Sequence, residues 1–229
     1  DLIKKVKMLR VLGQKTGSCF QRCVGLDGIN TVYSVTYEID RKCGTDYFER
    51  FKKWLTYIQE ENLMVVGAMT DPKGDRSKGP AEQVDPDQYL RIVERRDDGL
   101  VIRGAKLHMT GGVNSHEILI MPTTAMDEKS KDYAVVCAIP ADAPGVTMIF
   151  GRQANDDRKD NRERIDSGNP VFGGVGGEAV IAFEDVFVPW ERVFMNGETE
   201  FTNAMVYRFA AHHRANYGGC KTGLIDVLT

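Results

Sequence analysis

The fold is decided by one stretch of the sequence, residues 89–106, which reads YLRIVERRDDGLVIRGAK. Two runs rich in apolar and β-branched residues, 89–94 and 100–106, flank the segment 95–99, whose Asp-Gly pair is a strong signal for a hairpin turn. Further strand signals follow at 117–121, 133–139, 146–150 and 178–183. Strands at this spacing, with turns between them, predict an antiparallel barrel or sandwich.

Helical patterns stand on both sides of this β module. Apolar residues recur at helical spacing over 2–12 and again over 46–63, where Asp46 is placed to cap the helix. Helical texture returns over 198–214. The sequence therefore predicts an α+β fold. It divides into helices over 1–64, a middle β domain over 65–196 and the start of a second helical domain over 197–229.

Composition and charge exclude several classes of function. The chain has 229 residues, 28% of them charged, and a net charge of −3 without a basic patch, so nucleic acid is not an expected partner. No apolar run approaches the roughly 20 residues that a membrane span needs. The first residues are not Met and open directly into an amphipathic run, which suggests a chain cut inside a larger polypeptide. Five cysteines without a secretory signal predict thiols rather than disulfides.

The cysteines and one histidine offer a possible metal site. Cys19 and Cys23 stand one turn apart on a predicted helix, and the segment HRANYGGC supplies His213 and Cys220 far downstream. The glycine pair before Cys220 is expected to let the backbone turn sharply beside a ligand. Three thiols and one imidazole can bind zinc or an iron–sulfur cluster. They can equally be buried core residues, as expected for Cys137 in an apolar strand, and spacing alone leaves these alternatives open.

Three further features have both a functional and an ordinary interpretation. The loop 69–76, MTDPKGDR, follows a strand and can hold a phosphate or the polar edge of a cofactor, or it is a polar turn. The segment 108–112, HMTGG, is either a flavin contact or the end of a hairpin. Glu178 opens an apolar strand after two glycines and is either a buried catalytic carboxylate or a solvent-exposed strand start.

Four segments resemble the 4-hydroxybutyryl-CoA dehydratase branch of the 4-hydroxyphenylacetate 3-hydroxylase family, whose members share the acyl-CoA dehydrogenase fold. They are GQKTGSCFQRC (13–23), AMTDPKGDR (68–76), NSHE (114–117) and YRFAAHHRANYGGCK (207–221). The resemblance implies the end of an N-terminal helical part, a whole middle domain and the start of the C-terminal helices, most of which are missing from this chain.

The resemblance also implies a set of site residues. It places the ligands of a [4Fe–4S] cluster at Cys19, Cys23, His213 and Cys220. It places contacts with FAD at Met69, Thr70, Asp71, Pro72, Lys73, Gly74, Asp75, Arg76, His108, Met109 and Thr110. It assigns catalysis to His213, Glu178 and Tyr217, and puts Arg10 and Gln21 in the lining of the same cavity.

The implied activity is dehydration of 4-hydroxybutyryl-CoA to crotonyl-CoA by flavin radical chemistry with the cluster as Lewis acid, with vinylacetyl-CoA Δ-isomerase activity beside it. The implied protein is a cytoplasmic homotetramer that binds an acyl-CoA and neither nucleic acid nor membrane; Arg152 either meets a CoA phosphate or is solvated. Two alternatives stay open, an FAD-dependent aromatic monooxygenase and a non-catalytic β module stabilised by zinc. The isolated chain can also prove inactive or bind no cofactor.

Overall fold

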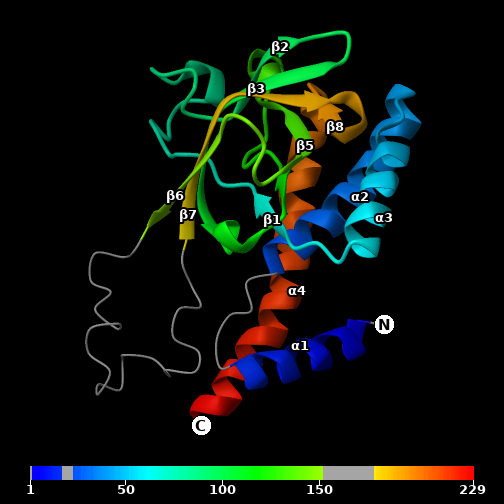
Figure 1. Ribbon diagram of the computed structural model, residues 1–229, viewed down its shortest axis with the longest axis vertical. Coiled ribbons are helices and arrows are strands. Elements are labelled where there is room, and N and C mark those ends of the chain that lie inside the picture. Colours follow the sequence, from blue (N-terminus) through cyan, green and yellow to red (C-terminus); the bar gives the residue numbers. More distant parts are fainter. Residues whose placement is uncertain (1, 17–22, 152–177) are drawn as a thin grey trace.

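The computed structural model describes residues 2–16, 23–151 and 178–229 (Figure 1). Three helices precede the strands and one long helix follows them: α1 (Leu2–Thr16), α2 (Cys23–Cys43), α3 (Tyr47–Glu60) and α4 (Thr202–Leu228). The strands are β1 (Val65–Ala68), β2 (Arg91–Arg95), β3 (Gly99–Thr110), β4 (Glu117–Ile120), β5 (Val135–Pro140), β6 (Val146–Gly151), β7 (Glu178–Pro189) and β8 (Val193–Asn196). The α+β class is confirmed, while the domain limits at 64 and 196 stay a prediction. Within the described ranges, every helix is too short or too polar to cross a membrane.

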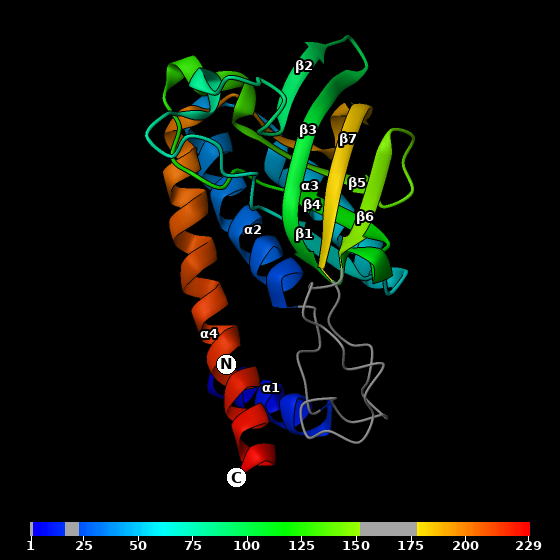
Figure 2. The ribbon, with the colours of Figure 1, turned by 90° about the vertical axis from the view of Figure 1, so that its left-hand side faces the viewer.

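The strands form two four-stranded sheets, ordered β1-β4-β5-β8 and β2-β3-β7-β6. The described pairs are antiparallel except β1 with β4, which run parallel. The two sheets face each other across a shared core, so the module is a sandwich and the alternative of a closed barrel is wrong (Figure 2). The predicted hairpin joins β2 to β3, where the Arg96 N–H donates to the Gly99 carbonyl at 2.8 Å.

The sheet β1-β4-β5-β8 is covered on both faces. One face packs on the second sheet and the other on α2, α3 and α4. This burial explains why β4 (EILI) and β5 (VVCAIP) are continuous apolar runs, whereas β7 alternates between buried and exposed residues along an outer sheet. The one carboxylate of β4, on Glu117, is bound by Trp54 Nε1 at 3.1 Å and by the guanidinium of Arg192 at 2.7 Å.

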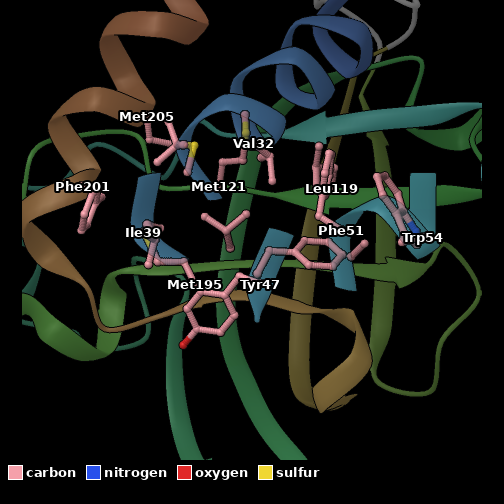
Figure 3. Close-up of a cluster of buried hydrophobic side chains, with 14 of the residues drawn as sticks. Val32, Ile39, Tyr47, Phe51, Trp54, Leu119, Met121, Met195, Phe201 and Met205 are labelled. Atoms are coloured by element: carbon pink, nitrogen blue, oxygen red, sulfur yellow. The ribbon is translucent and has the colours of Figure 1, made fainter. Parts of the chain in front are cut away.

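Aromatic side chains fasten the helices to this sheet. Phe51 and Trp54 of α3 pack against Phe194 of β8, with ring centroids 5.1 and 5.8 Å apart. Figure 3 shows the same cluster from α2 to α4, where Ile39 and Met205 complete the layer. The helices are therefore held to the sheet by hydrophobic packing.

The start of α3 differs in one detail from expectation. Asp46 occupies the N-cap position, but its side chain caps no described backbone N–H and pairs instead with Arg50 at 2.7 Å. The carboxylate of Asp40, at the end of α2, accepts from the N–H groups of Tyr47 and Phe48, both at 2.9 Å. One carboxylate thus closes α2 onto α3 and satisfies the first N–H groups of the helix.

Helix α4 continues through the glycine pair at which a sharp turn was expected, so that expectation is wrong. Gly219 lies where a Cβ would be 2.8 Å from the Cβ of Leu9 on α1. A Cβ on Gly13 of α1 would in turn lie 2.5 Å from the Cys220 carbonyl oxygen. The glycines therefore let the backbones of α1 and α4 approach each other closely, which requires no break in the helix.

Candidate functional site

The predicted site residues on β3 and β7 lie toward one end of the β module, and those on the last helix lie along α4. The ends of β3 and β7 that carry them, and the first turn of α2, are at the same end of the module, where α4 extends beyond the sheets (Figure 2). Four residues fall outside what can be described: Cys19, Gln21 and Arg152 lie outside the described ranges, and the side chain of Cys23 is not described although α2 begins there.

Glu178, His108 and Thr110 form one cluster. Glu178 opens β7 directly opposite Thr110, and its Oε1 accepts from the Thr110 hydroxyl at 3.2 Å. Its Oε2 lies 3.2 Å from His108 Nδ1. The carboxylate is therefore held through both oxygens while half of the side chain stays exposed. Held in this way it can accept a proton from a molecule bound above the strand ends.

A β-bulge explains why His108 reaches Glu178. The register of β3 against β7 shifts between Lys106 and Met109, and both of these side chains are buried. Two residues, Leu107 and His108, therefore lie between the buried side chains of Lys106 and Met109, where a regular strand has one. His108 has a left-handed backbone, φ +55°. The bulge places the imidazole of His108 at the surface. A strict alternation of inward and outward residues, which is all that the sequence predicts, does not predict this bulge.

The loop 69–76 is anchored from below by a lysine that the sequence reasoning missed. Lys106 is fully buried, and its ammonium donates to Asp71 Oδ1 at 2.8 Å and to the carbonyls of Met69 at 3.0 Å and Met121 at 2.9 Å. Burial raises the pKa of Asp71 and lowers the pKa of Lys106, and the opposite charge of each partner offsets part of that effect. Met69, Asp71 and Met109 thus point inward, so their contact with any cofactor would come from the backbone.

The outer half of this loop offers positive charge. Lys73 and Arg76 are exposed, and neither forms a hydrogen bond or ion pair with the described part of the chain. Gln83 fixes the loop, because its amide accepts from the Asp75 N–H and donates to the Asp75 carbonyl, both at 3.0 Å. Thr70 and Pro72 are half-buried, and Gly74 packs against Gln83 and Gln88. A fixed loop with two unpaired cations suits a phosphate group.

A second group of side chains joins α2 to α4. Asp27 is completely buried, and its Oδ2 lies 2.9 Å from His213 Nδ1. Its Oδ1 accepts a hydrogen bond from the Asn216 amide. Burial raises the pKa of Asp27, and the hydrogen bond from His213 opposes that shift. The sequence reasoning missed Asp27 and Asn216; an aspartate four residues after Cys23, on the same helix face, was the available signal.

The ring of His213 is enclosed along α4. Phe209, one turn earlier, stacks on it with a centroid distance of 5.7 Å and an interplanar angle of 11°, and the ring of Tyr217, one turn later, lies at 6.0 Å. Cys220 is buried, and its thiol lies 3.5 Å from the Tyr217 carbonyl oxygen. Tyr217 itself is half-exposed beneath the ammonium of Lys221. His213 and Cys220 are seven residues apart, about two helical turns, and so share one side of α4.

The described members of the predicted ligand set, His213 and Cys220, make up only part of a metal site. Among them, no three His, Cys, Asp or Glu side chains are grouped closely enough to hold a metal ion. The two described candidates, an imidazole with one nitrogen engaged by a carboxylate and a buried thiol on the same helix face, are of the kind that iron or zinc accepts. Arg10, expected in the lining of the same cavity, is half-exposed, and its guanidinium contacts both oxygens of Asp226 at 2.5 and 2.8 Å.

Comparison with known proteins gives consistent results. The profile of the 4-hydroxyphenylacetate 3-hydroxylase N-terminal family matches residues 1–195. The chain is 58% identical over its whole length to a 4-hydroxybutyryl-CoA dehydratase/vinylacetyl-CoA Δ-isomerase of Clostridium aminobutyricum, of which it covers 46%. It is 34% identical over 165 residues, 69% of the chain, to the oxygenase component of a 4-hydroxyphenylacetate 3-monooxygenase of Geobacillus, of which the match covers 31%.

Solved structures agree with this. An archaeal 4-hydroxybutyryl-CoA dehydratase from N. maritimus, described as oxygen tolerant, superposes with a TM-score of 0.93 at 55% identity, over 99% of this chain and 45% of that one. Butyryl-CoA dehydrogenase of Megasphaera elsdenii superposes with a TM-score of 0.62 over 99% of this chain and 50% of that one, but at 14% identity it shows only a shared fold. The acyl-CoA dehydrogenase fold is thereby confirmed. The chain spans less than half the length of the dehydratase and monooxygenase relatives named above.

Proposed function

The chain belongs to the 4-hydroxyphenylacetate 3-hydroxylase family, and from that membership we propose that the protein containing it dehydrates 4-hydroxybutyryl-CoA to crotonyl-CoA and isomerises vinylacetyl-CoA. The proposal includes FAD and a [4Fe–4S] cluster as cofactors, a homotetramer and a cytoplasmic location. Its first support is the relative that carries both activities in its name and matches the chain over all 229 residues at 58% identity.

One geometric observation carries the proposal, the contact between Asp27 and His213. These residues are 186 positions apart, and their contact sets the first turns of α2 against the middle of α4. Cys23 begins α2 one turn before Asp27, and Cys220 follows His213 on the same side of α4. Cys23, on one side, and His213 with Cys220, on the other, are thus carried by helices that touch, and this arrangement supports a site that draws ligands from both helices.

The cluster would be held by Cys19, Cys23, His213 and Cys220, and the flavin phosphates would lie against the loop that carries Lys73 and Arg76. When bound, the flavin supplies one-electron chemistry and the cluster supplies a Lewis-acidic iron. The residues of the chain then have to bind the thioester, exclude water and move protons. An imidazole ligand is neutral and exchanges more readily than a thiolate, so His213 is the ligand best suited to open toward the substrate.

Two proton abstractions are needed because C2 and C3 each lose a proton; one proton leaves as water with the C4 hydroxyl and the other is returned to C4. The thioester acidifies the C2 proton, whereas the C3 proton lies one carbon further away. We assign the two proton transfers to the Glu178 carboxylate, oriented by His108 and Thr110, and to Nε2 of His213, which would be able to accept a proton only when it is not bound to iron. We assign assistance in the second transfer to Tyr217, whose ring lies 6.0 Å from that of His213 on α4. A positioned acid or base contributes about 10²–10⁴-fold in rate.

The test is cofactor analysis and turnover of the anaerobically purified protein. We expect about four irons per chain with FAD, in line with three thiolates and one imidazole as ligands, and conversion of 4-hydroxybutyryl-CoA to crotonyl-CoA. Glu178→Gln should keep iron and flavin while turnover falls about 10²–10⁴-fold, and His213→Ala should abolish turnover. FAD without iron would favour the monooxygenase alternative, zinc without flavin would favour the non-catalytic β module, and full activity of His213→Ala would refute its assigned role.

A further inference from the structure

The contact between Asp27 and His213 has a property that packing alone does not explain. Asp27 is completely buried at the interface of two helices, and each of its two oxygens is used by a different side chain of α4. His213 and Asn216 are three residues apart, so both project from the same face of α4 toward α2. A buried carboxylate is costly unless it is hydrogen-bonded, and an apolar pair joins two helices without that cost.

The chemistry of the carboxylate determines the state of the imidazole. A carboxylate that faces a ring nitrogen normally accepts from it, so the contact between Asp27 Oδ2 and His213 Nδ1 favours the tautomer that carries its hydrogen on Nδ1. The lone pair of the ring is then on Nε2, on the opposite side of the imidazole. No described residue forms a hydrogen bond with Nε2, and about a third of the side chain is exposed.

The neighbouring side chains also restrict the rotation of the His213 ring. Phe209 stacks on one face within 11° of parallel, and Tyr217 lies at the other end, so the ring cannot rotate without losing these contacts. Asn216 keeps the carboxylate from turning, while its own Oδ1 is buried without a hydrogen-bond partner among the described residues. An unsatisfied buried oxygen is an unfavourable feature to keep in a contact that serves only stability.

We propose that Asp27 is the positioning residue of the metal site: it fixes the tautomer and the direction of His213 so that Nε2 is presented as an iron ligand. The proposal rests on the proposed function, since it requires iron at His213. Carboxylates in this position orient histidine ligands and raise their basicity, and their loss typically weakens metal binding 10–100-fold. Asn216 does not contact His213 in this role and instead orients the Asp27 carboxylate.

The test compares iron release in three variants of the anaerobically purified holoprotein. Asp27→Asn keeps the shape of the side chain and removes its charge, and we expect iron release to a chelator to become about 10–100-fold faster. Asn216→Ala leaves the Asp27–His213 contact in place and should accelerate release less. Glu38→Gln is the matched control, because Glu38 accepts from Arg208 at 2.6 Å across the same pair of helices without touching His213; its release rate should equal that of the wild type.

Two further measurements separate positioning from mere support. The thermal midpoint of the cofactor-free protein should stay close to that of the wild type in Asp27→Asn and in Glu38→Gln. The electron paramagnetic resonance spectrum of the reduced cluster should change in Asp27→Asn and, to a smaller extent, in Asn216→Ala, and should stay that of the wild type in Glu38→Gln. Unchanged iron release in Asp27→Asn would overturn the proposal while the proposed function stands. Faster iron release accompanied by a lower thermal midpoint of the cofactor-free protein would overturn it as well, because the variant would then lose iron through a loss of stability. A wild-type protein without iron would overturn both. If Asp27→Asn does not fold, Asn216→Ala decides by the same criteria.

Discussion

Asp71 in the β module and Asp27 between α2 and α4 are both buried against a basic side chain. In the β module every donor is used, because the three N–H groups of Lys106 go to Asp71, Met69 and Met121. In the helical contact, Nε2 of His213 and Oδ1 of Asn216 have no hydrogen-bond partner among the described residues. Native interiors leave few polar atoms unpaired, so the saturated group around Lys106 is complete in itself, whereas the helical contact keeps two polar atoms available for a further partner.

The largest effect should come from breaking the saturated group. Lys106→Met leaves Asp71 buried without its counter-charge, and the free energy of unfolding should fall by about 3–5 kcal/mol. Denaturant unfolding of the cofactor-free protein measures this. Adding Asp71→Asn removes the uncompensated charge and should restore more than half of the loss. If Lys106→Met destabilises no more than Asp27→Asn does, the contrast between the two carboxylates is wrong.

A smaller effect is expected where α1 meets α4. A Cβ on Gly223 would lie 2.1 Å from the Arg10 carbonyl oxygen, a backbone atom that moves only with its helix. Gly223→Ala should therefore push α1 away from α4 and cost about 1–3 kcal/mol of unfolding free energy. Because α1 packs on the segment that carries Cys220, the same variant should also lose iron. Retention of iron at the wild-type level would show that α1 does not support the ligand helix.

The fold was largely predictable because its signals are local. The Asp98-Gly99 turn predicts the hairpin, and continuous apolar runs mark the sheet that is covered on both faces. What could not be predicted depends on distant partners. The parallel pairing of β1 with β4 joins Val65 to Glu117, and α4 passes through Gly218 and Gly219 because α1 packs on it.

The candidate site was predictable in its residues and not in its geometry. The resemblance to the family supplied Glu178, His108 and Thr110, but only the bulge in β3 brings His108 out to the carboxylate. Asp27 and Lys106 escaped notice because a single charged residue in a helix or strand is normally solvated, and only the tertiary fold shows what it faces. Such residues are found from their burial and not from their spacing.

The pH dependence of stability sharpens the picture of the β module. Burial raises the pKa of the Cys137 thiol from its ordinary 9.0 to about 12. A group with a raised pKa in the folded state contributes its full stability below the unfolded pKa and loses it above, so the loss begins near pH 9 and continues toward pH 12. At pH 10 the ionisation of this thiol in the unfolded chain should have lowered the free energy of unfolding by about 1.4 kcal/mol. Cys137→Ala should lose correspondingly less stability than the wild type between pH 8 and pH 10, and equal losses would contradict the assignment.

The smallest predicted effect is a gain in stability, and it compares two glycines of α4 with each other. A Cβ on Gly218 meets no described atom within 4 Å, whereas one on Gly223 of the same helix meets the backbone of α1. Gly218→Ala should therefore add only its gain in helix propensity, up to about 1 kcal/mol, and keep its iron. A loss of stability in Gly218→Ala would mean that this face of α4 is covered in the whole protein. The pair of substitutions thus tells whether glycine in α4 serves close approach to α1 alone or also approach to a segment on its other side.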